Sequence, residues 1–404
     1  MDTKRRSLVR RNAPLRALIT ARLVSSAGTW IAYVALTVDV YSRTHSSTWV
    51  SAVLLADFLP SVSIVAVAGA WLDRVPRRTL LIGSEVAAGG VFASLPFAPN
   101  AAAIVGLALV AGCASAVFFP SLRATIPTLV TEEELPQANA LCLTVTMSGV
   151  AAGPVLAGIL VAASGVDLPY ALNAASFLVS AVLLARLPVG AKPVHEPGGG
   201  HWRDVLEGLR VYSDSAALAM LLRVWVLASL GGAAINVGEI FIARQTFQAG
   251  TFGFGLLASA SGVGLVAGSA IAPRLLEGSA ARACRIGLTA SAAGFGGAAL
   301  APNIWVAAVL AVVGGSGSAV LLSAATLLVQ RETDDARRGR AFAIFDGAGF
   351  AATGIGMSVS GLAIGAFGAR SVWLVAAGLM AFAALSSLPG RKAAEVRRAE
   401  PELS

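Results

Sequence analysis

Charged residues, cysteines and histidines are scarce in this sequence. Only 13% of its 404 residues are charged, whereas roughly 25% of a soluble chain is charged. The cysteines stand singly inside apolar runs and the histidines lie in or near polar connections, at Cys113, Cys142, Cys284, His45, His195 and His201. These positions predict no disulfide framework and no metal site. We also find no nucleophile–base pair and no phosphate-binding loop, so we expect neither an enzyme nor a cofactor.

Apolar residues dominate instead, with 56% of the chain hydrophobic and a mean hydropathy of +0.76. They form repeated runs of about 20 residues that are rich in Gly and Ala, typical of closely packed helices that cross a bilayer core of about 30 Å. Charged and Gly/Pro-marked breaks divide them into about twelve spans, beginning near residues 17, 48, 79, 101, 137, 168, 217, 251, 281, 302, 341 and 370. The first run is too long for a signal-peptide core and is expected to be retained. The sequence therefore predicts an all-α membrane protein.

Basic residues give these spans an orientation. If the N-terminus is cytoplasmic, all but three of the 30 lysines and arginines fall on the cytoplasmic side, the exceptions being Arg43, Arg244 and Arg370. Lys and Arg favour that side of a membrane. We therefore expect a multi-pass protein of the bacterial inner membrane with both termini cytoplasmic, and we interpret the net charge of +8 as a topology signal, not a nucleic-acid-binding surface.

The chain divides into two similar halves. Residues 1–188 are predicted to form an N-terminal six-helix bundle, residues 189–216 a polar cytoplasmic linker, and residues 217–404 a C-terminal six-helix bundle and tail. The halves match weakly at an offset of about 200 residues, as in the pairs Arg22 and Arg223, Arg43 and Arg244, Gly149 and Gly349, and Ala140 and Ala341. Transporters built from parallel repeats hold their substrate between the halves near the bilayer midplane.

The connection between the second and third spans reads GAWLDRVPRRTLL over residues 69–81. It resembles the cytoplasmic signature G-x-L-a-D-R-x-G-R-R-x-x-L of the major facilitator superfamily, which has twelve transmembrane helices in two pseudo-symmetric six-helix bundles. Gly69, Asp73, Arg74, Arg77 and Arg78 match, while Trp71 and Pro76 depart from the pattern. The resemblance implies a cytoplasmic gate in which Asp73 docks on the start of span eleven and pairs with Arg123. Alternatively, the three arginines only fix the topology.

The fifth span carries a second motif, GVAAGPVLAG over residues 149–158. Its Gly149, Gly153, Pro154 and Gly158 resemble the antiporter motif G-x-x-x-G-P-x-x-G-G of drug exporters in the same superfamily, with Ala157 departing. The alternative is an ordinary small-residue packing face. With the stretches at 119–130 and 132–140, the N-terminal half resembles the branch that exports enterobactin and macrolides.

Five carboxylates fall inside predicted spans, where each must face a cavity, find a partner or take up a proton. We expect Asp57, near the middle of the second span, to bind protons for coupling or to contact substrate; the alternative is a structural hydrogen-bonding role. Asp39 and Glu239 lie near the outer ends of spans one and seven, where they either pair with Arg43 and Arg244 or are solvated at the membrane interface. Glu85 and Asp346 lie near the cytoplasm, where Arg77, Arg78 or Arg340 would neutralise them in a latch; the alternative is that they take part in proton coupling.

Polar and aromatic residues of spans one and seven are candidates to line the central cavity, or else to pack between helices: Ser26, Trp30, Tyr33, Thr37, Trp225 and Asn236. A cavity with few polar groups suits small, largely apolar or amphipathic substrates. We therefore predict a monomeric secondary transporter that exports drugs, antibiotics or siderophores by alternating access in exchange for protons, with the substrate, protons and the lipid bilayer as its partners. The alternatives are a proton-coupled uptake symporter for a nutrient and a non-transporting membrane receptor or scaffold.

Overall fold

A computed structural model gives the fold, and it describes residues 8–72, 75–187 and 209–387. These residues form helices and connections, with no strand among them. The first half contains α2 (Ala13–Thr44), α3 (Ser47–Leu72), α4 (Arg77–Ser94), α5 (Ala101–Thr125), α6 (Leu135–Ser164) and α7 (Asp167–Leu184). The second half contains α9 (Ala216–Phe241), α10 (Gly250–Leu276), α11 (Ala280–Leu300), α12 (Ile304–Glu332), α13 (Asp335–Phe367) and α14 (Ala369–Ser386).

Polar caps fix where several of these helices begin. The side chains of Asn12, Asn100, Ser215, Ser279 and Asn303 accept hydrogen bonds from backbone N–H groups in the first turn of α2, α5, α9, α11 and α12. Such a cap satisfies donors that have no partner within the helix. The spans predicted to begin near residues 101 and 302 do begin there, because Asn100 and Asn303 each cap the start of a new helix.

Ten of these helices are long and apolar enough to cross a membrane, which confirms a polytopic membrane protein. Length and composition do not confirm the other two of the twelve predicted spans, which correspond to α3 and α11. In α3, the apolar stretch Ser47–Pro60 is too short to meet the length requirement. α11 is absent from the ten because its Gly, Ser and Thr residues, and Arg282 and Arg285 in its first turns, lower its mean hydropathy.

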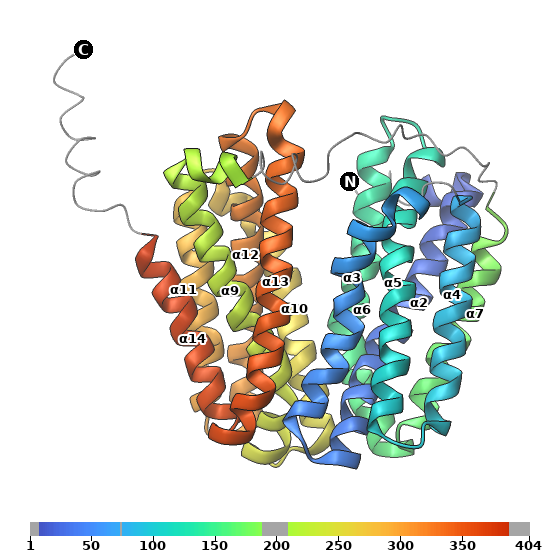
Figure 1. The fold of residues 1–404 in the computed structure, drawn as a ribbon, viewed down its shortest axis with the longest axis horizontal. Coiled ribbons are helices and arrows are strands. Elements are labelled where there is room, and N and C mark those ends of the chain that lie inside the picture. Colours follow the sequence, from blue (N-terminus) through green and yellow to red (C-terminus); the bar gives the residue numbers. More distant parts are fainter. Residues whose placement is uncertain (1–7, 73–74, 188–208, 388–404) are drawn as a thin grey trace.

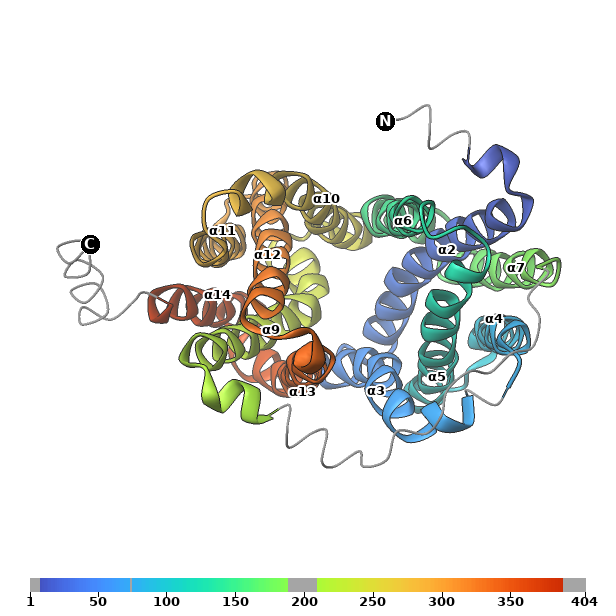
Figure 2. The ribbon, with the colours of Figure 1, turned by 90° about the horizontal axis from the view of Figure 1, so that it is seen from above.

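The helices are arranged as two six-helix bundles, α2–α7 and α9–α14, that stand side by side (Figure 1). Seen along the helices, α6 lies against α10 and α3 lies against α13, so two helix pairs join the bundles (Figure 2). The repeat is visible in the packing. A Cβ on Gly149 of α6 would meet Ser26 of α2, and a Cβ on Gly349 of α13 would meet Trp225 of α9, at the equivalent place in the second bundle.

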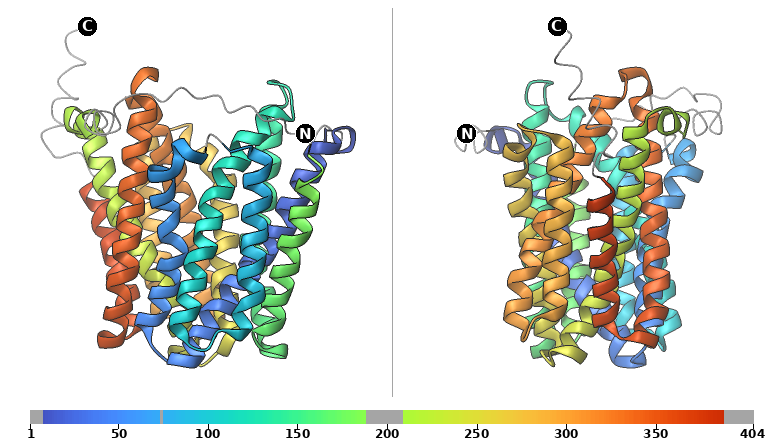
Figure 3. Two further views of the ribbon diagram at one scale, coloured as in Figure 1. Left: turned by 45° about the vertical axis from the view of Figure 1, so that its right-hand side comes forward. Right: turned by 90° about the vertical axis from the view of Figure 1, so that its left-hand side faces the viewer.

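The bundles share a core in only one half of their length. We call the face where α2 begins and α14 ends the terminal face, and the opposite one the far face; both can be followed in the side views of Figure 3. Toward the far face, one continuous cluster of buried apolar residues includes both bundles. Toward the terminal face, each bundle has a separate cluster of its own. The described bundles are therefore held together mainly through their far halves.

Candidate functional site

Three described polar side chains from both bundles lie close enough to influence one another electrostatically, without a direct hydrogen bond between any two of them. Asp57 is exposed although it lies in the middle of α3, and the next residue, Phe58, places its ring 5.7 Å from the ring of Phe350 on α13. Tyr33 of α2 interacts electrostatically with both Asp57 and Glu239, which lies on α9. We call Asp57, Tyr33 and Glu239 the interface cluster.

Glu239 is bonded differently from the expectation. Its side chain is buried and accepts a hydrogen bond from Ser261 Oγ of α10 at 3.2 Å. Arg244 instead donates to Thr251 Oγ1 at 2.5 Å and places its guanidinium 5.1 Å from the centre of the Tyr41 ring. The predicted Glu239–Arg244 pair is therefore absent. The turn over Ile242–Thr246 is π-helical, and its wider winding places Arg244 on a different side of the helix from Glu239.

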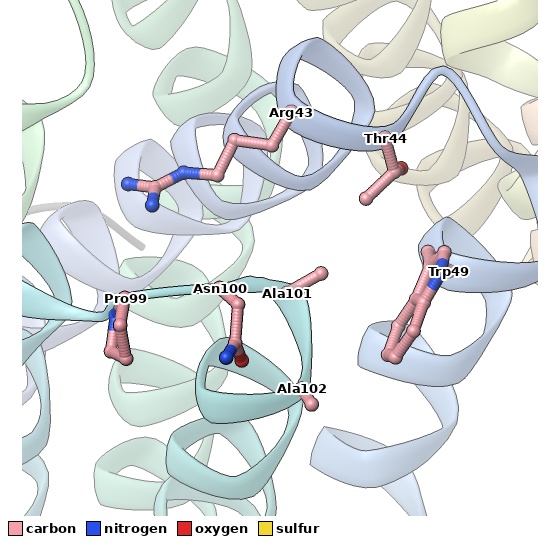
Figure 4. A pocket seen from close by; sticks show the side chains of 7 residues that line it. All are labelled: Arg43, Thr44, Trp49, Pro99, Asn100, Ala101 and Ala102. Atoms are coloured by element: carbon pink, nitrogen blue, oxygen red, sulfur yellow. The ribbon is translucent and has the colours of Figure 1, made fainter.

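Asp39 has the partner that the sequence predicted and one that it did not. Arg43 Nε lies 2.7 Å from Asp39 Oδ1, and Tyr170 OH donates to Asp39 Oδ2 at 3.1 Å from α7. The same arginine donates through Nη1 to the carbonyl oxygen of Ala98 at 2.9 Å. Figure 4 shows Arg43 beside Pro99 and Asn100, at the edge of an open depression of about 560 Å³. Asp39 thus ties three parts of the first bundle together at the far face.

This tie makes Arg43 important for stability. We expect Arg43→Gln to lower the free energy of unfolding by about 1 to 3 kcal/mol, because the buried Asp39 carboxylate loses its counter-charge. The effect is below that of a fully buried pair because the Arg43 side chain is 34% exposed. Thermal unfolding in detergent would measure it. Arg370→Gln, at an exposed arginine near the start of α14, is the matched control, and equal melting temperatures for the two variants would contradict this role.

The signature at residues 69–81 is described only in part. Gly69 lies in α3, but Asp73 and Arg74 lie outside the described residues, so the docking of Asp73 on α13 stays a prediction. Arg77 Nη1 donates to the carbonyl oxygen of Ala124 at 2.9 Å, and Arg78 donates to that of Ala185. Both arginines therefore bind carbonyl groups at the C-terminal ends of α5 and α7, where a helix favours cations.

The two carboxylates predicted to form a latch lie in different surroundings. Asp346 of α13 is exposed and lies within electrostatic range of Arg123 at the end of α5, without forming an ion pair with it. Glu85 is instead buried inside the first bundle, where it accepts a hydrogen bond from Ser25 Oγ at 3.3 Å. Since Arg77 and Arg78 bind carbonyl groups, the structure does not give Glu85 these predicted partners.

The antiporter-like motif brings α6 close to two neighbours at once. A Cβ on Gly153 would lie 2.5 Å from Trp30 Cβ of α2. On another face, Val155 N donates to Ser259 Oγ of α10 at 2.8 Å, and a Cβ on Gly158 would lie 3.2 Å from Phe252 Cα. The motif is thus both a packing face within the first bundle and one side of the contact between bundles, since small residues allow close backbone approach.

The cavity candidates fall into two groups. Trp30 and Tyr33 are half-buried with ring centres 5.5 Å apart, and Asn236 is exposed. By contrast, Ser26 and Thr37 are buried, and their hydroxyls donate to the carbonyl oxygens of Thr146 and Tyr33, respectively. Trp225 is half-buried and stacks on Phe345, with 4.6 Å between ring centres. Trp30, Tyr33 and Asn236 are therefore the better candidates for substrate contact.

Repeated bundles of membrane-length helices, with carboxylates where the bundles meet, define a membrane transporter of the major facilitator type. A family profile described as transmembrane secretion effector matches residues 9–400. The chain belongs to this family of the major facilitator superfamily.

Relatives of known name are distant in sequence. An uncharacterized MFS-type transporter of Bacillus subtilis, YfiS, is 25% identical, and the match covers 97% of this chain and 96% of that protein. The enterobactin exporter EntS of Salmonella typhimurium is 31% identical over 201 residues. That match covers 47% of this chain and 48% of EntS, so the similarity extends over only about half of each protein.

Solved structures confirm the fold. A bacterial homologue of the iron transporter ferroportin in an inward-facing state has a TM-score of 0.74 and 18% identity, over 93% of this chain and 99% of that one. A POT family transporter in complex with a thioalcohol-conjugated peptide also has a TM-score of 0.74, with 13% identity over 92% of this chain and 94% of that one.

Proposed function

We propose that this transporter exports small amphipathic compounds by alternating access, driven by proton antiport. The observation that carries the proposal is the interface cluster, because its Asp57 is exposed at mid-helix and its charge, like that of Glu239 in the other bundle, acts on Tyr33. A carboxylate at this place can bind a proton in one arrangement of the bundles and release it in the other. Proton binding can then shift the equilibrium between the two arrangements.

The arrangement of cores suggests how access alternates. Separate cores toward the terminal face and a shared core toward the far face correspond to a state with the far side closed. Rocking of the bundles would separate the α6–α10 and α3–α13 contacts and bring the terminal halves together. With the terminal face cytoplasmic, as the basic residues predict, substrate would enter from the cytoplasm and leave on the other side.

The chemistry around the cluster favours amphipathic substrates. Trp30, Tyr33, Phe58 and Phe350 supply aromatic surface, while Asp57 and Asn236 are exposed polar groups. Aromatic faces with few polar groups bind compounds that are mostly apolar. The similarity to enterobactin exporters over half the chain supports export and leaves the compound to be identified by experiment.

Transport in proteoliposomes tests the proposal. We expect a fluorescent amphipathic compound to move against its concentration gradient when protons flow the opposite way, and an uncoupler to stop this movement. Movement of compound and protons in the same direction would show an uptake symporter. No movement of any compound in a chemically diverse panel, with correctly inserted protein, would favour a receptor or scaffold.

A further inference from the structure

A small cavity lies inside the first bundle, and Trp30, whose ring centre is 5.5 Å from that of Tyr33 in the interface cluster, forms part of its wall. Its volume is about 230 Å³, and α2, α4, α5, α6 and α7 surround it. Its wall includes one acidic and one basic side chain, Glu85 and Arg22, among mainly apolar and hydroxyl-bearing residues. Pockets for drug-sized ligands usually measure about 300 to 1,000 Å³. This cavity is smaller, and its polar groups suit a few water molecules.

Glu85 has incomplete hydrogen bonding. Its side chain is 2% exposed. Oε1 accepts the bond from Ser25, whereas Oε2 is buried without a hydrogen-bond partner among the described residues. Ser180 Oγ of α7 lies near this carboxyl group and is likewise buried without a hydrogen bond of acceptable geometry. Burying an ionised carboxylate with so few partners is costly, so this group needs either a proton or water.

Arg22 shares the cavity without pairing directly with Glu85. It is 6% exposed, its Nε donates to Thr146 Oγ1 at 3.0 Å, and its guanidinium carbon lies 4.9 Å from the centre of the Phe119 ring. No ion pair joins it to Glu85 in the part of the chain that the structure describes, although the two charges attract each other. The cavity thus keeps a positive and a negative group apart.

The other helices around Glu85 contribute no further charge to the described wall. α5 contributes Ser115 and Phe118, and α7 contributes Phe177. α6 contributes Thr146 and Met147, and its Cys142 is a titratable group that interacts with Arg22. Arg22 is therefore the main charged group in the described wall that influences the protonation of Glu85.

The second bundle has no equivalent arrangement. In the register that pairs Arg22 with Arg223, Ser25 corresponds to Val226, the residue after Trp225, and Val145 corresponds to Phe345 at an offset of 200. The rings of Trp225 and Phe345 stack with an interplanar angle of 20°, so large side chains fill the equivalent region. Arg223, the counterpart of Arg22, is exposed. The charged cavity is therefore a feature of the first half, not a consequence of the repeated fold.

We infer that Glu85 is a proton-binding site of the N-terminal bundle, separate from Asp57, with Arg22 as the positioning counter-charge and cavity water as the route of proton exchange. Proton uptake converts the carboxylate to a neutral acid and removes its attraction to Arg22. Proton loss restores that attraction between α4 and α2. Only the use of this site in coupling rests on the proposed function; proton binding itself does not.

Infrared spectroscopy of the full-length protein in lipid vesicles tests this inference without substrate or a proton gradient. We expect a carbonyl band of a buried protonated carboxyl group that disappears as pH rises. Glu239 is another buried carboxyl group, so the comparison is made in a Glu239→Gln background. There Glu85→Gln should remove the band, whereas Glu133→Gln, at an exposed glutamate in the connection between α5 and α6, should leave it unchanged. Arg22→Gln should extend the band to higher pH by about one unit, because an opposite charge favours the ionised carboxylate, and Arg22→Lys should largely restore the original profile.

A smaller change keeps the test valid if Glu85→Gln or Arg22→Gln prevents folding. Ser25→Ala removes the hydrogen bond to Oε1, so the band should move to higher frequency. The inference is overturned if the Glu239→Gln background lacks the band, if the band does not change with pH, or if it survives Glu85→Gln there. An unchanged pH profile in Arg22→Gln would overturn the role of Arg22. Failure of gradient-driven transport would refute the proposed exporter and leave this titration result intact.

Discussion

Replacing Asp57 by asparagine is expected to abolish proton-driven transport while substrate exchange continues. Asparagine has nearly the shape of a protonated aspartic acid but cannot release a proton. The exposed position of Asp57 on α3 means that the change buries no additional polar group, so the fold should be retained. The variant should therefore cycle between its two arrangements without using the proton gradient.

Two transport assays separate these effects. A pH difference of one unit stores about 1.4 kcal/mol per proton, enough for one-for-one electroneutral antiport to support about a tenfold concentration ratio of substrate. This ratio should fall to one in Asp57→Asn, while exchange of labelled for unlabelled substrate persists. Asp214→Asn, at an exposed aspartate before α9, should behave as wild type. If Asp57→Asn still builds a proton-dependent ratio, Asp57 is not the coupling group.

The membrane fold could be predicted because composition and local patterns determine it. Apolar runs must form helices in a bilayer, where each backbone group needs a partner within the protein. The polar caps at Asn100 and Asn303 mark helix starts in the sequence itself. The Asp39–Arg43 pair was also predictable, since residues four apart are neighbours on one face of a helix.

The partners of the other buried charges depend on contacts between distant helices. The hydrogen bond from Tyr170 to Asp39 joins residues 131 positions apart, and no local pattern indicates it. Arg22 was assigned to the cytoplasmic side with the other basic residues, although it is buried in the first bundle. Its place several residues inside an apolar run was the available signal that it serves the interior. The π-helical turn that separates Arg244 from Glu239 likewise had no recognisable pattern.

The contact between α6 and α10 leads to a second prediction, in which one substitution in α10 has a large effect on the conformational equilibrium. A Cβ on Gly255 of α10 would lie 2.3 Å from the carbonyl oxygen of Pro154 on α6. That oxygen belongs to the backbone and cannot rotate away as a side chain could, so the helices must separate. Pro154 is part of the antiporter-like motif, and the shared core of the two bundles lies in the same half of the molecule. In the proposed alternating-access cycle, the approach of these two backbones is therefore needed to close the far side.

Gly255→Ala is accordingly expected to destabilise the far-closed arrangement by about 1 to 3 kcal/mol, the usual cost of overpacking, which shifts the conformational equilibrium by about 5- to 150-fold. Transport should slow because one half of the cycle becomes unfavourable. Spin labels on cysteines at exposed Ser164 and Gln245, in a protein without its native cysteines, should show a larger population with the far ends apart. Gly90→Ala is the control, since a Cβ there meets nothing within 4 Å. If both variants give the wild-type distance distribution, close packing of α6 on α10 does not control access.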